Sequence, residues 1–302
     1  MLLVLPVSRV DLGMAIEMAK WAKKLGPYDR HKALIVWDPA IVFEQRVRFR
    51  RLVDQWGFAF VTELEPTLRA DEVGWPAGPN GMFRHTVSHI QRTADLRGPW
   101  YFFEADNVPM VAGWLDKIEA EYNRTRMRFP CMGVLENSWM EARSGGLIHR
   151  IPVGKHLVGT AVYPWDLVRL TMSFMHTGNR AFDVVMQDDL VPEYARHTDL
   201  IQHNWLTCNY RWENGVIKCD AADGKIEGQK GYALNHDVRK NAVVVHGCKD
   251  GSLLRVLQAE HELALQAERE KVVAFVEQPV EPAPVVNPPA RKPRRRKQPA
   301  AC

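Results

Sequence analysis

The 302-residue chain has no run of about 18 apolar residues, so no transmembrane helix is predicted. Cysteine is scarce, since the five cysteines are scattered and include no Cys-x-x-Cys pair. That pattern argues against a disulfide scaffold or a zinc site and favours free thiols in a reducing compartment. The apolar residues 1–8 are too short for a signal peptide and lack its basic start. We therefore expect a cytoplasmic protein that begins with a buried strand.

Acidic residues are missing from the end of the chain. Segment 291–302 contains no acid and six basic residues, Arg291, Lys292, Arg294, Arg295, Arg296 and Lys297. The remainder is close to neutral, so the net charge of +4 comes from this tail. Six of the residues 279–293 are proline, too many to pack, which predicts a disordered, Pro-rich basic tail over 279–302.

Strand and helix patterns alternate along the first part of the chain, and no internal repeat is visible. Strands are predicted at 2–7, 32–36, 58–63, 100–103, 157–163 and 242–245. Helices are predicted at 11–25, 41–56, 82–94, 109–122 and 253–277, with an irregular Gly/Pro loop at 74–81. The β-α-β-α-β opening indicates an α/β fold with a doubly wound nucleotide-binding sheet.

Two acids follow the aromatic strand at 100–103. Glu104 and Asp106 stand where that strand ends, and the carboxyl edge of such a sheet is where α/β proteins bind ligands. Two carboxylates there suit Mg²⁺ or Mn²⁺, which usually carry a phosphate. The alternative is an acidic turn in which Asp106 caps the next helix.

Four further positions are candidates for ligand contacts near the same edge. Ser8 follows the first strand, where a base and ribose would bind, whereas Asp11 is better explained as a helix N-cap. Asn80 and Arg84 lie in and after the Gly/Pro loop, where a helix N-terminus and a guanidinium could hold an anion. The alternative for Asn80 and Arg84 is a solvated surface loop.

Later in the chain, His246 ends a strand and Lys249 lies in a turn bracketed by glycines. His246 could be a third ligand beside two carboxylates, and Lys249 could neutralise a diphosphate. A structural histidine is the alternative. Asp188 and Asp189 could act as a general base that accepts a proton from an attacking hydroxyl, or they could be a common acid pair at a helix start.

These motifs, in this order, resemble a glycosyltransferase of the GT-A fold over about residues 1–252, and the resemblance implies a doubly wound mixed sheet. The matching features are the first strand with Pro6, Val7 and Ser8, the Gly/Pro loop, the acid pair at 104–106 and the late His246 and Lys249. The resemblance implies that Asp106, Glu104 and His246 bind a divalent metal, Mn²⁺ or Mg²⁺. It also implies a nucleoside diphosphate sugar as donor, most simply a UDP-sugar. Glu104 departs from the family's Asp-x-Asp motif, which makes Asp106 the more direct ligand.

The chain also resembles the bacteriophage glycosyltransferases that add sugars to hydroxymethylated pyrimidines in DNA. This narrower resemblance implies a phage protein in the cytoplasm of an infected bacterium. The charge of the basic tail suits contacts to DNA phosphates. The alternatives for the tail are a solubilising or nonspecific segment and a contact with an anionic membrane. A polysaccharide or lipid-linked acceptor, a non-catalytic nucleotide- or DNA-binding protein and a nucleotidyltransferase are alternatives. The predicted organisation is a catalytic domain at 1–252, a helix at 253–278 and the tail at 279–302.

Overall fold

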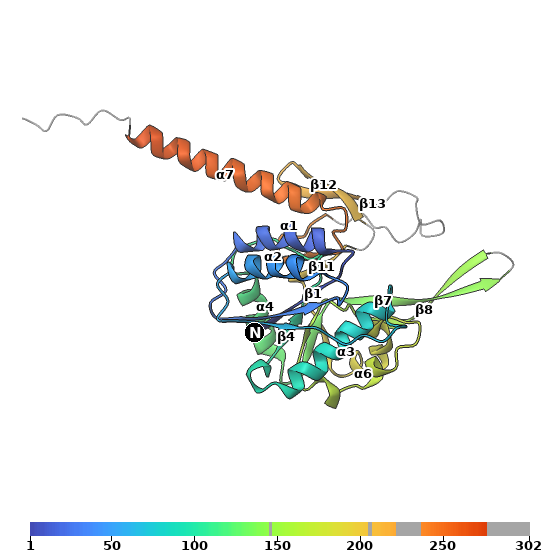
Figure 1. Ribbon diagram of the computed structural model, residues 1–302. Coiled ribbons are helices and arrows are strands. Elements are labelled where there is room, and N and C mark those ends of the chain that lie inside the picture. Colours follow the sequence, from blue (N-terminus) through green and yellow to red (C-terminus); the bar gives the residue numbers. More distant parts are fainter. Residues whose placement is uncertain (145–146, 205–206, 222–236, 277–302) are drawn as a thin grey trace, which may run out of the picture. The chain divides into compact units, whose positions relative to one another are not determined.

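The computed structural model describes residues 1–144, 147–204, 207–221 and 237–276 (Figure 1). The chain divides into two compact units, Met1–Ala259 and Glu260–Cys302. Helix α7, Ser252–Val276, begins in the first unit and continues in the second. The predicted tail at 279–302 lies outside the described residues, and the predicted domain ends at 252 and 278 stay predictions. In the described residues, no helix is long and apolar enough to cross a membrane.

The main sheet has seven strands in the order β10-β6-β9-β4-β1-β2-β3. Its strands are β1 Leu2–Val7, β2 Lys32–Trp37, β3 Phe60–Leu64, β4 Trp100–Phe102, β6 Cys131–Gly133, β9 Val162–Tyr163 and β10 Ala195–His197. Strands β4, β1, β2 and β3 are parallel, whereas β9 pairs antiparallel with both β4 and β6. The sheet is therefore mixed. Strands β2 and β3 lie on one side of β1 and β4 lies on the other, so the strand order reverses between β1 and β4.

Side chains that alternate along these strands pack into two hydrophobic cores, one on each face of the sheet. Leu3 and Leu5 of β1 pack with helices α1 (Leu12–Lys23), α2 (Phe43–Asp54) and α4 (Trp114–Thr125). Leu2 and Val4 pack with α3 (Ala77–Arg92), α5 (Phe182–Val185) and α6 (Gln187–Leu190). In Figure 1, α1 and α2 accordingly lie on one side of the sheet and α3 and α6 on the other. The β-strand period of two thus sets which helices cover which face.

A second, three-stranded sheet brings a late segment of the chain to the first. Its order is β11 (Ile201–His203), β14 (Val244–His246) and β5 (Val108–Pro109), with β11 and β14 parallel. Two antiparallel pairs complete the strands of the described residues, β7 (Leu135–Ser144) with β8 (Leu147–Leu157) and β12 (Thr207–Glu213) with β13 (Val216–Ala221). Short 3₁₀ turns lie at Ala94–Leu96, Leu167–Arg169 and Ser173–Met175. Because β5 directly follows the acid pair, the second sheet places His246 next to it.

The predicted α/β class with a mixed sheet and a C-terminal helix is confirmed. The prediction of a loop at 74–81 is wrong in its second half, because α3 begins at Ala77. Pro79 fits there, since the first N–H groups of a helix have no partner inside it. The helix predicted at 109–122 begins at Trp114, after a left-handed Gly113 and the short β5.

The strand predicted at 157–163 is also wrong, because it is divided between the end of β8 and β9. The break contains Thr160, whose hydroxyl donates to the Phe102 carbonyl of the neighbouring strand. The prediction of free thiols agrees with Cys131 and Cys248, which are buried and form no disulfide among the described residues.

Candidate active site

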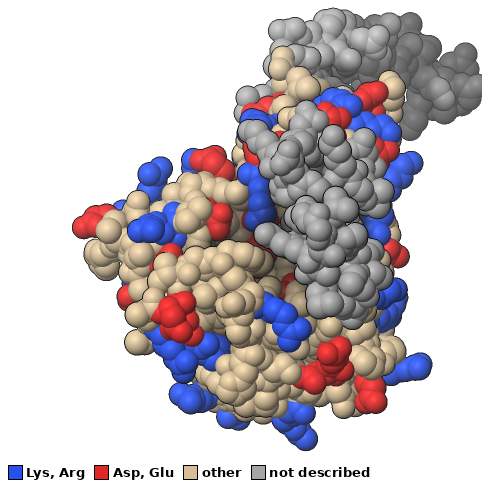
Figure 2. Space-filling view, turned by 90° about the vertical axis from the view of Figure 1, so that its right-hand side faces the viewer, with Lys and Arg blue, Asp and Glu red and all other residues tan. Residues whose placement is uncertain are grey.

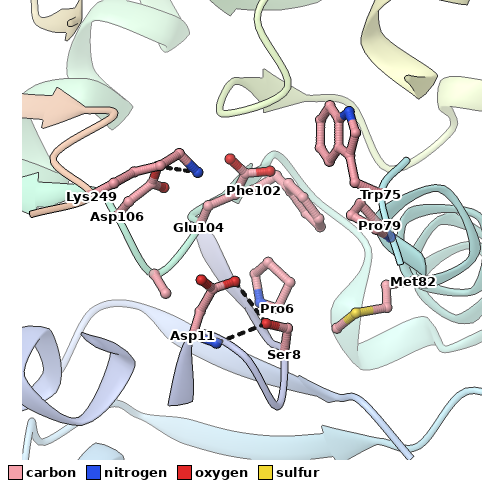
Figure 3. Close-up of a pocket in the computed structure, with 11 residues that line it drawn as sticks. Pro6, Ser8, Asp11, Trp75, Pro79, Met82, Phe102, Glu104, Asp106 and Lys249 are labelled. Carbon is pink, nitrogen blue, oxygen red and sulfur yellow. Dashed lines mark hydrogen bonds and ion pairs between the residues drawn. The ribbon is translucent and has the colours of Figure 1, made fainter. Parts of the chain in front are cut away.

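A pocket opens at the carboxyl ends of β1 and β4, where the strand order of the main sheet reverses. Ligands bind at such a switch point because the loops on its two sides leave in opposite directions. The pocket is lined by Pro6, Ser8, Asp11, Trp75, Pro79, Met82, Phe102, Glu104, Ala105, Asp106 and Lys249. Figure 3 shows the charged side chains Glu104, Asp106 and Lys249 across from Trp75, Pro79 and Met82. One wall is therefore charged and the opposite wall apolar.

The turn that carries the two acids is held by buried hydrogen bonds. Asn107 donates from its backbone to the Glu104 carbonyl at 3.1 Å and from its side-chain amide at 3.0 Å. The same amide donates to Thr160 Oγ1 at 2.9 Å, and Thr160 donates to the Phe102 carbonyl. Both Asn107 and Thr160 are fully buried. The turn is thus fixed to β4 and to the segment before β9, which keeps Glu104 and Asp106 at the pocket.

His246 meets both acids through one ring nitrogen. Its Nε2 lies 2.9 Å from Glu104 Oε2 and 3.3 Å from Asp106 Oδ1. The next residue, Gly247, has a positive φ of 93°, a conformation in which glycine carries no steric cost. This turn lets the Cys248 N–H donate to the Asp106 carbonyl. The loops after β4 and β14 are therefore joined at the site.

The charges of this cluster are mutually stabilising. Burial alone would lower the pKa of His246, but Asp106 and Glu104 outweigh it and raise the pKa to about 10. Burial would raise the pKa of the Asp106 carboxyl, yet His246 and Lys249 hold it below its usual range. Lys249 Nζ lies 3.2 Å from Asp106 Oδ2, and the Lys249 side chain is 71% exposed. Lys249 can therefore move toward a bound anion, whereas His246 and Asp106 are held in place.

The donor set fits a divalent cation. One ligand atom from each of Glu104, Asp106 and His246 lies within 4.8 Å of the others. Two carboxylates and an imidazole suit Mn²⁺ and related ions. Asp106 Oδ2 is buried and has no hydrogen-bond partner, although Lys249 forms an ion pair with it. A cation shared by the three side chains would satisfy that oxygen.

Asp11 contributes to the pocket in a way that differs from its expected role. It occupies the N-cap position of α1 but makes no capping hydrogen bond with its side chain. Ser8 Oγ instead donates to Asp11 Oδ2 at 2.7 Å, and the Asp11 N–H donates to Ser8 Oγ at 3.0 Å. The expectation of a side-chain cap is wrong, because the Asp11 carboxylate accepts a hydrogen bond from Ser8 instead and lines the pocket.

Of the eleven predicted site residues that the structure describes, six lie together and five lie elsewhere; the six basic residues of 291–297 lie outside the described residues. Pro6, Ser8, Glu104, Asp106 and Lys249 line the pocket, and His246 contacts the two acids. Those outside the lining are Val7, Asn80, Arg84, Asp188 and Asp189. The functional roles of all eleven stay predictions.

The five residues outside the lining have other contacts or surroundings. Val7 is buried in the core. The Asn80 side chain donates to the Arg180 carbonyl and accepts from the Phe182 N–H, which ties α3 to α5. Arg84 forms an ion pair with Glu72. Asp188 is exposed, whereas Asp189 accepts hydrogen bonds from the hydroxyls of Thr171 and Ser173.

Several residues at the site were missed from the sequence. Trp75, Pro79 and Met82 form the apolar wall, and the proline and glycine content of 74–81 was the available signal. His203 was given no role, yet its Nδ1 lies 2.9 Å from His246 Nδ1. Burial and the charge of His246 hold the pKa of His203 well below its usual value, so His203 is neutral. Only strand pairing reveals His203, because 43 residues separate it from His246.

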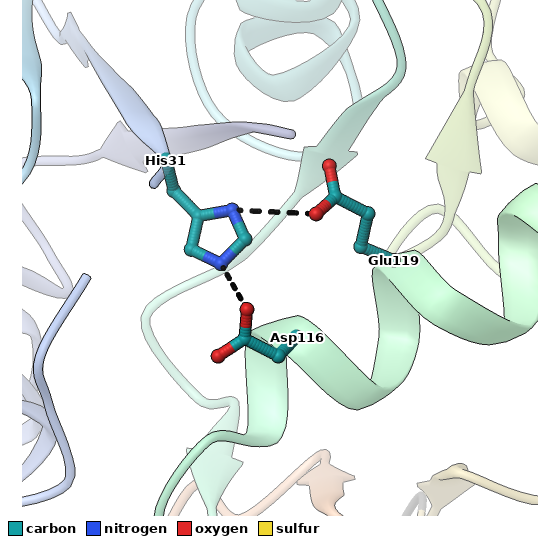
Figure 4. Close-up of side chains that lie close together, drawn as sticks. All are labelled: His31, Asp116 and Glu119. Atoms are coloured by element: carbon teal, nitrogen blue, oxygen red, sulfur yellow. Dashed lines mark ion pairs between the residues drawn. The ribbon is translucent and has the colours of Figure 1, made fainter. Parts of the chain in front are cut away.

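A second group with similar donors lies at the other end of the sheet. His31, just before β2, faces Asp116 and Glu119 of α4 (Figure 4). Its two ring nitrogens point to different carboxylates, Nε2 to Asp116 at 3.3 Å and Nδ1 to Glu119 at 3.9 Å. The Met1 amine pairs with Glu119 at 2.5 Å, and Arg30 lies near both acids. These cations already balance the carboxylates, and no single ring nitrogen is shared by both acids.

No protein-family model matches the chain, and none of the curated proteins matches it. Among solved structures it is similar to the apo form of mouse xyloside xylosyltransferase 1, with a TM-score of 0.47 and 10% identity over 81% of this chain and 96% of that one. It is also similar to the galactosyltransferase LgtC in complex with donor and acceptor sugar analogues, with a TM-score of 0.46 and 10% identity over 82% and 87% of the two chains.

A third similar structure is residues 1–349 of S. aureus TarS, with a TM-score of 0.41 and 11% identity over 65% of this chain and 57% of that one. Identities and TM-scores this low leave the function to be argued from the site itself.

Proposed function

We propose that this protein is a metal-dependent glycosyltransferase that moves a sugar from a nucleoside diphosphate sugar to a hydroxyl group. The observation that carries the proposal is the convergence of Glu104, Asp106 and His246 in the pocket at the switch point of the sheet. Hard carboxylate ligands at such an edge suit a cation that holds a diphosphate. The order of the motifs along the chain, which resembles GT-A glycosyltransferases, gives separate support.

The residues of the pocket have different proposed roles in binding the donor. Glu104, Asp106 and His246 would hold the cation, and Ser8 and Asp11 would contact the nucleoside at the end of β1. When bound there, a divalent cation supplies Lewis-acid stabilisation of the charge on the departing diphosphate. Lys249, next to Asp106 and largely exposed, adds a second positive charge for the same diphosphate. The apolar wall of Trp75, Pro79 and Met82 can pack against the face of a sugar or base and exclude water.

In the transfer step the bond between the anomeric carbon and the diphosphate oxygen breaks, and its electron pair leaves with the nucleoside diphosphate. The acceptor oxygen forms the new bond to that carbon, and its proton passes to a base. Asp188 and Asp189 remain our candidates for this base if the transfer inverts the anomeric carbon. Asp188 is exposed, whereas Asp189 already accepts two hydrogen bonds, so Asp188 is the freer of the two to accept a proton.

For the acceptor, we propose a hydroxymethylated base in phage DNA, because of the basic residues 291–297 and the narrower sequence resemblance. On the face drawn in Figure 2, Lys and Arg are interspersed with Asp and Glu among the described residues. In this proposal DNA binding depends on the tail, because the positive charge excess of the sequence lies there. Removal of 279–302 should abolish salt-sensitive DNA binding while transfer to a small acceptor continues.

A donor screen tests the proposed reaction. The protein would be incubated with Mn²⁺, a panel of nucleotide sugars and either hydroxymethylated or unmodified DNA, and DNA mass and nucleoside diphosphate release would be followed. A sugar-sized mass gain on modified DNA alone supports both the reaction and the acceptor. Nucleoside diphosphate release without a DNA mass change keeps the transferase and favours a polysaccharide or lipid-linked acceptor. Pyrophosphate release would point to a nucleotidyltransferase, and no release with any donor would contradict an enzyme of either class.

A further inference from the structure

His203 and His246 occupy matching positions on neighbouring strands. Strands β11 and β14 are parallel, and His203 is directly paired with His246 in their register. The two ring centroids are 4.7 Å apart, and the Nδ1 atoms are separated by 2.9 Å. The Asn204 N–H donates to the His246 carbonyl at 2.9 Å, which fixes the two strands at this point. The backbone therefore holds the two rings at hydrogen-bond distance.

Two ring nitrogens at 2.9 Å can share only one hydrogen, so one must donate and the other accept. The other nitrogen of His246, Nε2, faces Glu104 and Asp106. A histidine can bind a cation only through a nitrogen without a hydrogen. If Nε2 binds the cation, the single hydrogen of the neutral His246 ring must be on Nδ1, the atom that faces His203.

We propose that His203 is a positioning residue that, when the cation is bound, accepts the Nδ1 hydrogen of His246, so that His246 Nε2 faces the cation without a hydrogen. This inference rests on the proposed function, because the cation belongs to the same site. His203 would select one tautomer of His246 and also fix the angle of its ring. In the opposite tautomer, the hydrogen on Nε2 would occupy the position of the cation. A histidine that binds a metal is commonly oriented by a partner that accepts the hydrogen of its other ring nitrogen.

Because His246 is buried, loss of this hydrogen bond should weaken the cation site. His246 is only 6% exposed, so water cannot readily replace the lost acceptor if His203 is removed. The Nδ1–H would then be left in the buried interior, or the ring would take the other tautomer. Either result weakens the cation site without altering any of its three ligands.

Two substitutions separate the hydrogen bond from the ring. His203→Phe keeps an aromatic ring against His246 but removes the acceptor, whereas His203→Asn can place an amide oxygen close to the position of Nδ1. His176→Phe, at an exposed histidine, is the matched control. Mn²⁺ affinity would be measured by calorimetry, with circular dichroism and thermal unfolding as checks on folding.

We expect His203→Phe to raise the Mn²⁺ dissociation constant roughly 10–100-fold. His203→Asn should recover most of that loss, and His176→Phe should leave the affinity unchanged. A folded His203→Phe protein that binds Mn²⁺ within about twofold of the unsubstituted protein would overturn the inference, as would equal weakening by Phe and Asn.

Nitrogen NMR on the metal-free protein distinguishes failure of this inference from failure of the proposed function. A hydrogen-bonded pair should show scalar coupling between the Nδ1 nuclei of His203 and His246 in ¹⁵N-labelled protein, with His203 bare at Nδ1. Coupling without any Mn²⁺ binding would overturn the cation site, and with it the role of His203 toward a cation, while the pairing would stand. Mn²⁺ binding without coupling would overturn the role of His203 and leave the proposed function in place.

Discussion

Glu104, Asp106 and His246 have the same donor types as His31, Asp116 and Glu119, but the two clusters are arranged differently. In the first cluster a single ring nitrogen faces both acids, and the group borders a pocket at the carboxyl ends of the strands. In the second, each ring nitrogen faces its own carboxylate at the amino ends of the strands. Residue types alone therefore do not make a site, because the donors must converge on one point.

The two histidines also respond to their surroundings in opposite directions. The acids beside His246 outweigh its burial and raise its pKa to about 10. For His31, burial and the positive Met1 amine outweigh Glu119 and Asp116 and lower the pKa. The pKa values differ because burial, helped by the Met1 amine, prevails at His31, whereas the two acids prevail over burial at His246. The comparison can be tested by making matched substitutions in both clusters.

The largest expected effect comes from the two aspartates. Asp106→Asn should reduce sugar transfer roughly 100-fold or more, because it removes a charged ligand from the proposed cation site. Asp116→Asn should leave transfer within about twofold, since Asp116 lies at the other end of the sheet. Turnover would be measured with the donor found in the screen. Full activity of a folded Asp106→Asn protein would remove the metal from the proposed mechanism.

The two glutamates provide a test that needs no substrate. Glu104→Gln should weaken Mn²⁺ binding roughly 10–100-fold, a loss typical of damage to a metal site. Glu119→Gln should not change the affinity, because the Met1 amine already occupies that carboxylate. Calorimetry with Mn²⁺ should find one site per chain in the unsubstituted protein. A Mn²⁺ site that disappeared with Glu119→Gln instead would reverse our assignment of the two clusters.

The exposed cations of the two clusters form a matched pair, since Lys249 and Arg30 are both 71% exposed. Lys249→Ala should raise the Michaelis constant for the donor about three- to tenfold, because an exposed charge contributes modestly to anion binding. Arg30→Ala should leave that constant unchanged. Steady-state kinetics over a range of donor concentrations and salt would measure both. Equal constants for the two variants would show that Lys249 does not contact the diphosphate.

The smallest expected effect is on the pH dependence of stability. A lowered pKa for His31 means that the unfolded chain takes up a proton more readily, so stability is lost as the pH falls below about 6.5. The charged groups that face His31 are the Met1 amine, Asp116 and Glu119, with Arg30 close to both acids. His31→Gln should reduce the fall in melting temperature between pH 7.5 and 5.5 by about 1–3 °C.

His246 should behave in the opposite way, because its pKa is raised. The stability that it contributes is fully present below about pH 6.5 and is lost as the pH rises toward 10. The melting temperature of the metal-free protein should therefore exceed that of His246→Gln by more at pH 6 than at pH 9. Parallel pH profiles for the His31 and His246 variants would contradict the comparison.

Much of the central fold could be predicted from local pattern. The strand at 2–7 matches β1 at both ends, and the acid pair follows β4 as expected. Buried apolar runs and helical periodicity are local signals, so the first three strands and two helices were visible in the sequence. The start of α3 was missed, because Gly78 and Pro79 suggest a loop although both are tolerated in the first turn of a helix.

The site was only partly predictable. Glu104, Asp106 and His246 were selected from their place at strand ends, and Lys249 from the Gly-bracketed turn that follows; both are properties of the sequence. The position of Asp189 could not be foreseen, because Thr171 and Ser173 reach it through a fold that local pattern does not describe. Arg84 likewise pairs with Glu72, a partner that only the loop before α3 brings into range.

The sequence by itself determined the α/β class, the acid pair after an aromatic strand and the late histidine, because each depends on neighbouring residues. Only the tertiary structure decided which donors share a point in space. The pairing of β11 with β14 placed His203 against His246, and the antiparallel contact of β14 with β5 brought His246 to Glu104 and Asp106. Those contacts join residues more than 40 positions apart, and strand pairing across such distances leaves no periodic signal in the chain.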